Sequence, residues 1–379
     1  MITIPVYYVR GGTSSGAIFF KNQLPSGEIL IEEILRKTFG VPLDGENRKN
    51  KQVEGIGKSK STTNKAFIID IDKNKKFVIS NFAQLEATSN QIAWNVNCGN
   101  MSSAIPLVLH EAGLIKTIAQ DNEITINNIN TGKTLRCRIY PRSDQQLACC
   151  KIPGINEAYP RVDVAFVDPE GSKTGLALPT GNVRDRIHGV EVSCVDVVVP
   201  MVIIAADSLG LKGDEQAEIL LTNPSLLQRI DAIRIEAGLR MKLRNKAGNL
   251  MSEQEIAVST TLPKVGIVAR SQLQQRGIRI IYLTPKEVHG SIAVSGGSCL
   301  AYACAQSGSI AADIFPVSVG ESVPVEHYAG ISEFEIDRED GRLLAKTVRN
   351  AQIIIKGEVM IHNPSPALLH YYSSLAITA

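Results

Sequence analysis

Short runs rich in Val, Ile, Tyr and Thr recur along the whole chain and are separated by Gly, Asn, Asp and Pro. Typical examples are ITIPVYYVR, KAFIIDI, EITINNI, RVDVAFV and AQIIIKGEVMI. Runs of this kind predict β-strands bounded by turns. Helical periodicity is clear in few places, such as GEILIEEILRKTF at residues 27–39 and residues 214–243, interrupted near Pro224. Many strands with few helices predict an α+β fold and not a doubly wound sheet.

Two segments, one in each half of the chain, share a local pattern. NCGNMSSAIPLVLHEAGLI and SGGSCLAYACAQSGSI both begin with a tight turn, continue as a helix of small residues and end at a glycine. At roughly 150 residues per domain, the 379 residues also correspond to two domains. We therefore predict two pseudo-symmetric domains, residues 1–181 and 182–379, each with a strand-rich sheet wrapped around a central helix. The last strand is free to return to the first domain.

Composition argues against several classes of partner and site. The formal net charge is +2, with Lys and Arg spread along the chain, so neither nucleic acid nor an anionic membrane is expected. No apolar stretch approaches the roughly 20 residues that cross a bilayer, and MITIPVYYVRGG lacks signal-peptide features, so we expect a cytoplasmic protein. The seven cysteines form no CxxC pair and no zinc-site spacing, so we expect reduced thiols and no metal. The oligomeric state is left open, with a homodimer as one option.

A glycine-rich turn lies in VRGGTSSGAIFF, residues 9–20. Gly11 and Gly16 have the spacing of a phosphate loop, but Ala17 stands where that loop has its lysine, and a strand-like run follows. We therefore expect no nucleotide. The backbone N–H groups of this turn, with the hydroxyls of Thr13 and Ser14, are suited to a smaller anion such as a carboxylate. A plain hairpin turn is the alternative.

The turn NCGN, residues 97–100, places Cys98 among hydrogen-bonding amides at a predicted helix start. Unpaired N–H groups and the helix dipole favour negative charge there, and such an environment favours the thiolate of a cysteine. A thiolate beside an anion-binding helix end is equipped to remove a proton from carbon next to a carboxylate. A small buried cysteine is the alternative.

Lys65 opens a strand after the hydroxyl-rich run STTN. At the mouth of a pocket, a lysine can act as acid or base, or can hold a carboxylate. A solvated lysine at the end of a strand is the alternative.

Taken together, the motifs resemble the PrpF-like family, which includes 2-methylaconitate cis-trans isomerase, 3-methylitaconate isomerase and 4-oxalomesaconate tautomerase. The resemblance rests on VRGGTSSG, STTNKAFII, NCGNMSSA, GSKTGLALPTGN, IEAGLRMKL, YLTPKEVHGSIAV, VEHYAG and NAQIIIKGEVMI, which occur in the expected order. Two stretches, GLALPTGNVRDRIHGVEVSCVD and RIIYLTPKEVHGSIAV, look most like the tautomerase. The resemblance implies a diaminopimelate-epimerase-like fold, with the active site in a cleft between two domains.

The resemblance also implies site residues and a reaction that needs no cofactor. Lys65 and Cys98 correspond to the family's acid/base pair. The remaining positions are expected to bind a small carboxylate substrate: Gly11, Gly12, Thr13, Ser14, Asn97, Gly99, Asn100, Gly296, Gly297 and Ser298.

Four segments depart from the family's motifs. The family has a lysine in RGGTSKG, where this chain has Ser15. Pro106 falls within the predicted second turn of the helix that follows NCGN, where a proline removes a backbone hydrogen bond unless it stays within the first turn of a helix. EHYAG replaces EHPSG at residues 326–330, and DVVVP replaces DNGMP at residues 196–200. These changes bear on the substrate more than on the fold.

Three functions follow from these observations. The first is a cofactor-independent isomerase or tautomerase that shifts a C=C bond in an unsaturated di- or tricarboxylate. The second is amino-acid racemisation or epimerisation, which on this fold uses a cysteine from each half, whereas here Ser298 stands at the apparent counterpart position, followed by Cys299. The third is a carboxylate-binding or accessory protein, suggested by the altered EHYAG and DVVVP loops. His289 and His327 lie in motifs and are either substrate contacts or structural residues.

Overall fold

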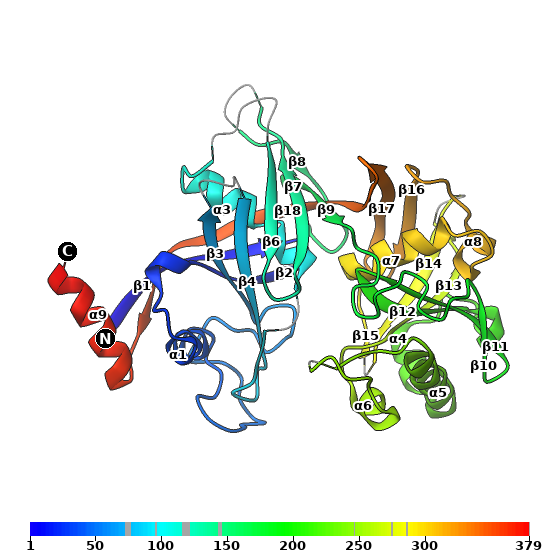
Figure 1. Cartoon of the computed structure of the whole chain (residues 1–379), viewed down its shortest axis with the longest axis horizontal. Coiled ribbons are helices and arrows are strands. Elements are labelled where there is room, and N and C mark those ends of the chain that lie inside the picture. The colour runs from blue at the N-terminus through cyan, green and yellow to red at the C-terminus, as the bar shows by residue number, and fades with distance from the viewer. Residues whose placement is uncertain are drawn as a thin grey trace. The chain divides into compact units, whose positions relative to one another are not determined.

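A computed structural model describes residues 1–378 except 73–76, 95–96, 116–121, 143–145, 246, 274–275 and 286. The chain forms two compact units (Figure 1). The first comprises Met1–Lys151, Glu157–Val164 and Arg349–Ala379, and the second comprises Ile152–Asn156 and Ala165–Val348. The boundary predicted after Gly181 therefore falls inside the second unit, and the C-terminal part of the chain belongs to the first.

Eight strands of the first unit pair in a closed ring. The order is β1, β2, β3, β4, β6, β7, β9, β18 and back to β1. With the two short strands β5 and β8, the bounds are Ile2–Gly11 (β1), Ser14–Phe20 (β2), Lys65–Asp72 (β3), Phe77–Leu85 (β4), Ile92–Ala93 (β5), Glu123–Asn128 (β6), Lys133–Ile139 (β7), Cys149–Cys150 (β8), Tyr159–Val167 (β9) and Arg342–Ile361 (β18). The helices are a 3-10 turn at Lys21–Gln23, α1 at Glu28–Phe39, α2 at Gly99–Ser102, α3 at Ile105–Glu111 and α9 at Pro366–Thr378.

The second unit builds its sheet in the order β11, β12, β13, β14, β16, β17 and β18. The strands are Asp185–Ile187 (β10), Val190–Val197 (β11), Val199–Ala205 (β12), Lys264–Arg270 (β13), Ile278–Thr284 (β14), Glu287–Val288 (β15), Ser322–His327 (β16) and Gly330–Glu339 (β17). The helices are a 3-10 turn at Asp207–Leu209, α4 at Ala217–Leu221, α5 at Pro224–Arg240, α6 at Glu253–Val258, α7 at Val294–Cys304 and α8 at Ile310–Ile314.

The two units repeat one pattern of strand pairing. From β1 to β7, the neighbours along the sheet pair antiparallel, parallel, antiparallel, parallel and antiparallel. From β11 to β17 the same succession occurs. In each unit, the second of the two parallel crossovers contains helices that pack on the strands of that unit. These helices are α2 and α3 between β4 and β6, and α7 between β14 and β16. The predicted pseudo-symmetry and α+β class are therefore confirmed.

Each unit has its own apolar core. In the first, Ile34, Leu35 and Phe39 on one side of α1 pack with buried residues of β1 to β4. Gly40 ends that helix in the left-handed conformation, as is common at helix C-termini. In the second, α5 contributes Ile230, Ile233 and Ala237 to a separate cluster with β11, β12 and β13. The predicted helix at 27–39 is confirmed to within one residue.

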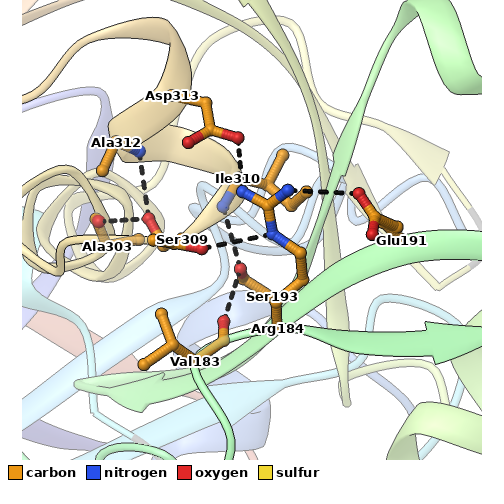
Figure 2. Close-up of polar contacts among 10 residues, drawn as sticks. Val183, Arg184, Glu191, Ser193, Ala303, Ser309, Ile310, Ala312 and Asp313 are labelled. Carbon is orange, nitrogen blue, oxygen red and sulfur yellow. Dashed lines mark hydrogen bonds and ion pairs between the residues drawn. The ribbon is translucent and has the colours of Figure 1, made fainter.

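Polar contacts attach α8 and the end of α7 to the second unit's sheet (Figure 2). Ser193 on β11 accepts a hydrogen bond from the N–H of Ile310 at 3.0 Å. Ser309 caps α8 and donates to the carbonyl oxygen of Ala303 at 2.6 Å. Arg184 forms ion pairs with Glu191 and Asp313. These bonds hold α8 and the C-terminal end of α7 against the sheet.

Two elements have details that local sequence patterns do not predict. The helix expected after NCGN is two short helices, and Pro106 lies in the first turn of α3, where its missing N–H has no partner to lose. The run VEVSCVDVVVPMVIIA is two antiparallel strands that meet in a tight hairpin at Val198. No helix in the described ranges is long and apolar enough to span a membrane.

Candidate active site

The turn between β1 and β2 consists of Gly12 and Thr13, because Gly11 pairs with Ser14 in the strand register. Gly12 has a φ of +53°, which glycine adopts without strain. Arg10 supports the turn by donating to the carbonyl oxygen of Gly12 at 2.8 Å. The glycine-rich segment is therefore a hairpin, and the strand-like run expected after it is β2.

The NCGN turn packs directly on this hairpin. A Cβ atom on Gly11 would lie 2.5 Å from the carbonyl oxygen of Asn100, and one on Gly12 would lie 2.3 Å from Asn100 Oδ1. Real Cβ atoms do not approach other atoms so closely, so both glycines are required for the contact. Asn100 Nδ2 also donates to Thr13 Oγ1 at 3.2 Å. The hairpin and the turn thus form one rigid group.

Cys98 is the N-cap residue of α2 and is partly exposed. Its Sγ accepts a hydrogen bond from the N–H of Met101 at 3.5 Å and lies 3.7 Å from Ser14 Oγ. Because α2 is a single turn of four residues, it has no long helix dipole of the kind expected from the sequence. The partial positive charge beside the thiol comes instead from the nearest N–H groups. The thiol therefore has a neighbouring hydroxyl and a backbone donor.

Lys65 is the first residue of β3, directly beside Gly16 of β2 in a parallel pair. A Cβ atom on Gly16 would lie 2.0 Å from the carbonyl oxygen of Lys65, so glycine is needed for this approach. The side chain is buried, with 9% of its surface exposed. Burial lowers the pKa of the Lys65 ammonium, while the nearby Cys98 and Glu86 act in the opposite direction. Lys65 is therefore not the solvated strand-end lysine of the alternative.

The first unit gathers most of the predicted site residues. The hairpin residues contact the NCGN turn, Cys98 lies beside Ser14, and Lys65 is near enough to Cys98 for an electrostatic interaction. Asn97 Oδ1 accepts the N–H of Cys98 at 2.8 Å and so holds the turn. Gly99 begins α2, and its N–H, like that of Asn100, has no intrahelical partner. These two N–H groups face the start of the helix, next to the thiol.

The three predicted residues of the second half lie in the first turns of α7. A Cβ on Gly296 would lie 2.5 Å from the ring of Tyr282, and one on Gly297 would lie 2.0 Å from the ring of Phe334. The N–H of Gly297 already donates to Ala293 O at 3.0 Å. Ser298 is completely buried. The structure thus gives both glycines a packing role, and carboxylate binding by this turn stays a prediction.

The helix bounds separate Ser298 from a position like that of Cys98. Cys98 is the N-cap of α2, whereas Ser298 lies in the second turn of α7, which begins at Val294. Cys299 is buried, its Sγ donates to Val195 O at 3.6 Å, and burial raises the pKa of its thiol. The paired cysteines that amino-acid racemisation requires are therefore not formed by these residues.

The altered motif loops have structural partners within the second unit. Glu326 is buried, forms an ion pair with Arg279 at 2.7 Å and accepts from Ser271 Oγ at 2.6 Å. Asp196 is also buried and accepts the N–H groups of Lys173 and Thr174, both at 2.8 Å. Both acidic residues therefore retain partners that hold the surrounding loops.

The two motif histidines are also hydrogen-bonded. His327 Nε2 lies 2.9 Å from Ser332 Oγ, and His289 Nδ1 lies 2.9 Å from the carbonyl oxygen of Ser291. Across the part of the chain that the structure describes, no three His, Cys, Asp or Glu side chains form a group that could hold a metal ion.

A family model described as PrpF protein matches residues 1–362. The chain belongs to the PrpF family. A 4-oxalomesaconate tautomerase from Pseudomonas putida is 30% identical over 365 residues, covering 94% of this chain and 96% of that protein. The predicted family and the predicted isomerase class are thus confirmed.

Solved structures confirm the PrpF-family fold. The crystal structure of a methylitaconate-delta-isomerase matches with a TM-score of 0.79 and 24% identity, covering 94% of this chain and 95% of that one. A hydroxyproline epimerase from Agrobacterium vitis matches with a TM-score of 0.52 and 11% identity, covering 97% of this chain and 93% of that one. The expected epimerase-like fold is therefore confirmed, and at these identities the two structures speak for the fold alone.

Sequence reasoning missed the side chains that support the site. Gln84 lies opposite Lys65 in the β3–β4 pair and accepts a hydrogen bond from its ammonium. Asn350, far away in the sequence, accepts from Arg10 Nη1 at 2.8 Å and so supports the hairpin. Neither residue belongs to a recognisable local motif, because its role depends on strand register.

Proposed function

We propose that this PrpF-family protein is a cofactor-independent isomerase that moves a C=C bond by proton transfer in an unsaturated tricarboxylate of the 4-oxalomesaconate type. The observation that carries this proposal is that one hairpin lies beside both residues: Cys98 Sγ is 3.7 Å from Ser14 Oγ, and Lys65 pairs with Gly16 on the same strand. The substrate class comes from the tautomerase that is 30% identical over nearly the whole chain.

The proposed reaction removes a proton from a carbon that is next to the C=C bond and conjugated with a carboxylate or keto group. The electron pair spreads into an extended enolate, and a proton returns to a different carbon, so the formula is unchanged. We assign the base to the Lys65 amine, because burial favours its neutral form. The Cys98 thiol then supplies the proton that returns to the substrate. A later proton transfer from the Lys65 ammonium to the Cys98 thiolate restores both groups.

Backbone donors near the pair are suited to the negative charge that develops on the substrate. The N–H groups of Gly99 and Asn100 open α2, and the hairpin adds the Thr13 and Ser14 hydroxyls. Donors fixed in place before the reaction stabilise an enolate without reorganising. In this proposal, Gly11 and Gly12 allow the hairpin to pack closely on the NCGN turn, and the Thr13 and Ser14 hydroxyls contact a substrate carboxylate.

The test follows the reaction directly. Purified protein is incubated in D2O with 4-oxalomesaconate, aconitate, 2-methylaconitate or 3-methylitaconate, and proton NMR follows the vinyl and methylene signals. Interconversion of isomers or deuterium uptake identifies the substrate. If the protein binds these acids in calorimetry but exchanges no proton in any of them, the accessory-protein alternative is correct.

Cys98→Ser and Lys65→Met are each expected to lower kcat by about 10²- to 10⁴-fold, the usual contribution of a positioned acid or base. Cys149→Ser and Lys60→Met are the matched controls, since both side chains are exposed. Thermal unfolding should show the same midpoint for all four variants. A Cys98 or Lys65 variant that turns over the responding acid as fast as its control contradicts the assigned roles.

A further inference from the structure

Gln84 is the cross-strand neighbour of Lys65. The two residues are directly opposite in the antiparallel β3–β4 pair, and Lys65 Nζ donates a hydrogen bond to Gln84 Oε1. Side chains at opposite positions of such a pair point to the same face of the sheet. The carboxamide is therefore a fixed neighbour of the lysine and not a chance contact of a flexible surface chain.

The orientation of the Gln84 amide is determined by its other hydrogen bonds. Nε2 donates to the carbonyl oxygen of Asn64 at 2.9 Å and to that of Ser61 at 3.1 Å. A flipped amide would place Oε1 against these two carbonyl oxygens, where no donor is available. The backbone that precedes β3 thus obliges Gln84 to present an acceptor, and not a donor, to Lys65.

A neutral acceptor has a particular effect on a lysine that works as a base. It takes one N–H of the amine and leaves the nitrogen lone pair directed away from Gln84. It adds no negative charge, so it does not lock the nitrogen as an ammonium in the way that a carboxylate would. The ionisable groups that face Lys65 are Cys98 from the NCGN turn and Glu86 from the end of β4, and the Phe82 ring lies 5.5 Å from Nζ.

We propose that Gln84 is a positioning residue that orients the Lys65 amine and keeps it available as a base. This inference rests on the proposed function, in which Lys65 transfers the proton. It assigns a role to a residue outside the acid/base pair and the carboxylate-binding turns. It also predicts the opposite effects of two substitutions at one position.

The first readout is the titration of Lys65 itself, which requires no turnover. Protein labelled with [ε-13C]lysine is titrated by NMR, and the Lys65 signal is assigned from its loss in Lys65→Arg. Gln84→Glu should raise the midpoint by about one pH unit or more, because a carboxylate favours the ammonium. Gln84→Met should lower it, because the ammonium loses an acceptor. General structural damage does not move a midpoint in opposite directions.

Gln91→Glu is the matched control, because Gln91 is exposed and the change adds the same charge to the same unit. Its Lys65 midpoint should stay that of the wild type. If the midpoint is also unchanged in both Gln84 variants, the proposal is overturned. If it moves equally in the control, the effect is one of net charge and the proposal is again overturned.

The second readout is the pH profile of kcat/KM with the acid that responds in the D2O panel. With Lys65 as the base, Gln84→Glu should move the acid limb to higher pH, and a limb displaced by one pH unit has about tenfold lower activity at a given pH. If the alkaline limb moves instead, Lys65 is the acid, and both the base assignment and the proposal that Gln84 keeps the amine available as a base are overturned. If Lys65 titrates as expected but no acid is turned over, the proposed function fails separately.

Discussion

Val198 is a single residue held in an unfavourable backbone conformation. It is the tip of the β11–β12 hairpin, where Val197 pairs with Val199, and its φ is +62°. Its N–H donates to Pro169 O at 2.8 Å. A β-branched residue is strongly disfavoured in this region, at a cost of at least about 1 kcal/mol. The family motif DNGMP has a glycine at this position. With Val198 in its place the hairpin still forms, but its tip is strained.

Val198→Gly is expected to raise the free energy of unfolding by about 1 kcal/mol, since relief of the left-handed strain outweighs the entropy cost of glycine. Equilibrium denaturation measures the change. The matched control is Val199→Gly, in the buried start of β12, which should be destabilising because strand glycine loses packing and entropy. Equal losses of stability in both variants would show that Val198 is not strained.

At the scale of elements, α7 packs so closely on its sheet that a methyl group on its glycines would displace neighbouring rings. A Cβ on Gly297 would lie 2.0 Å from the ring of Phe334, a fully buried side chain of β17. The first unit shows the same principle between strands, because Gly16 allows β2 to approach Lys65. In both units, glycine sets the distance between a site-bearing segment and its support.

Gly297→Ala is expected to destabilise the protein by about 1–3 kcal/mol, because the added methyl overpacks the core. The same change in a Phe334→Ala background should cost much less, since the ring is gone. A double-mutant cycle by chemical denaturation gives the coupling between the two positions. Gly357→Ala is the control, because its Cβ would meet only Ile355 Cγ2 at 3.8 Å. Additive losses in the cycle would contradict the packing role of Gly297.

At the scale of the molecule, the chain has two separate cores with one pairing plan. The first unit is assembled from three segments of the chain, whereas nearly all of the second is the continuous stretch Ala165–Val348. The ends of this stretch are bonded to each other, since the N–H of Asp168 donates to Leu343 O at 2.9 Å. The proposed acid/base pair and its supporting hairpin belong entirely to the first unit.

Residues 165–348 are therefore expected to fold alone, with a cooperative thermal transition and a circular dichroism spectrum of mixed strands and helices. The physical reason is an internal core that depends on few residues outside the stretch. The fragment should show no proton exchange with the responding acid, because Cys98 and Lys65 are absent. A matched fragment of residues 182–348, cut at the predicted boundary, lacks the Asp168–Leu343 bond and should be less stable. A non-cooperative transition for 165–348 would contradict independent folding.

The local signals of the sequence were enough for most of the architecture. Alternating β-branched runs, the periodic helix at 27–39 and the repeated turn-and-helix pattern depend on neighbours within a few residues, so strands, α1 and the two-fold repeat could be predicted. The failures had longer-range causes. The break before α3 follows from Pro106 acting together with packing, and the extent of each unit follows from β9 and β18, which run through both.

The sequence by itself determined the family, the isomerase class and the candidate acid/base pair, because the order of motifs and the types of residue are known without any tertiary contact. Only the tertiary structure decided which residues meet. Gln84 faces Lys65 through strand register, Asn100 packs on Gly12 through a contact that requires glycine, and Ser298 is buried within α7. Each of these depends on segments far apart in the chain, whose approach is determined by packing and pairing and not by local preference.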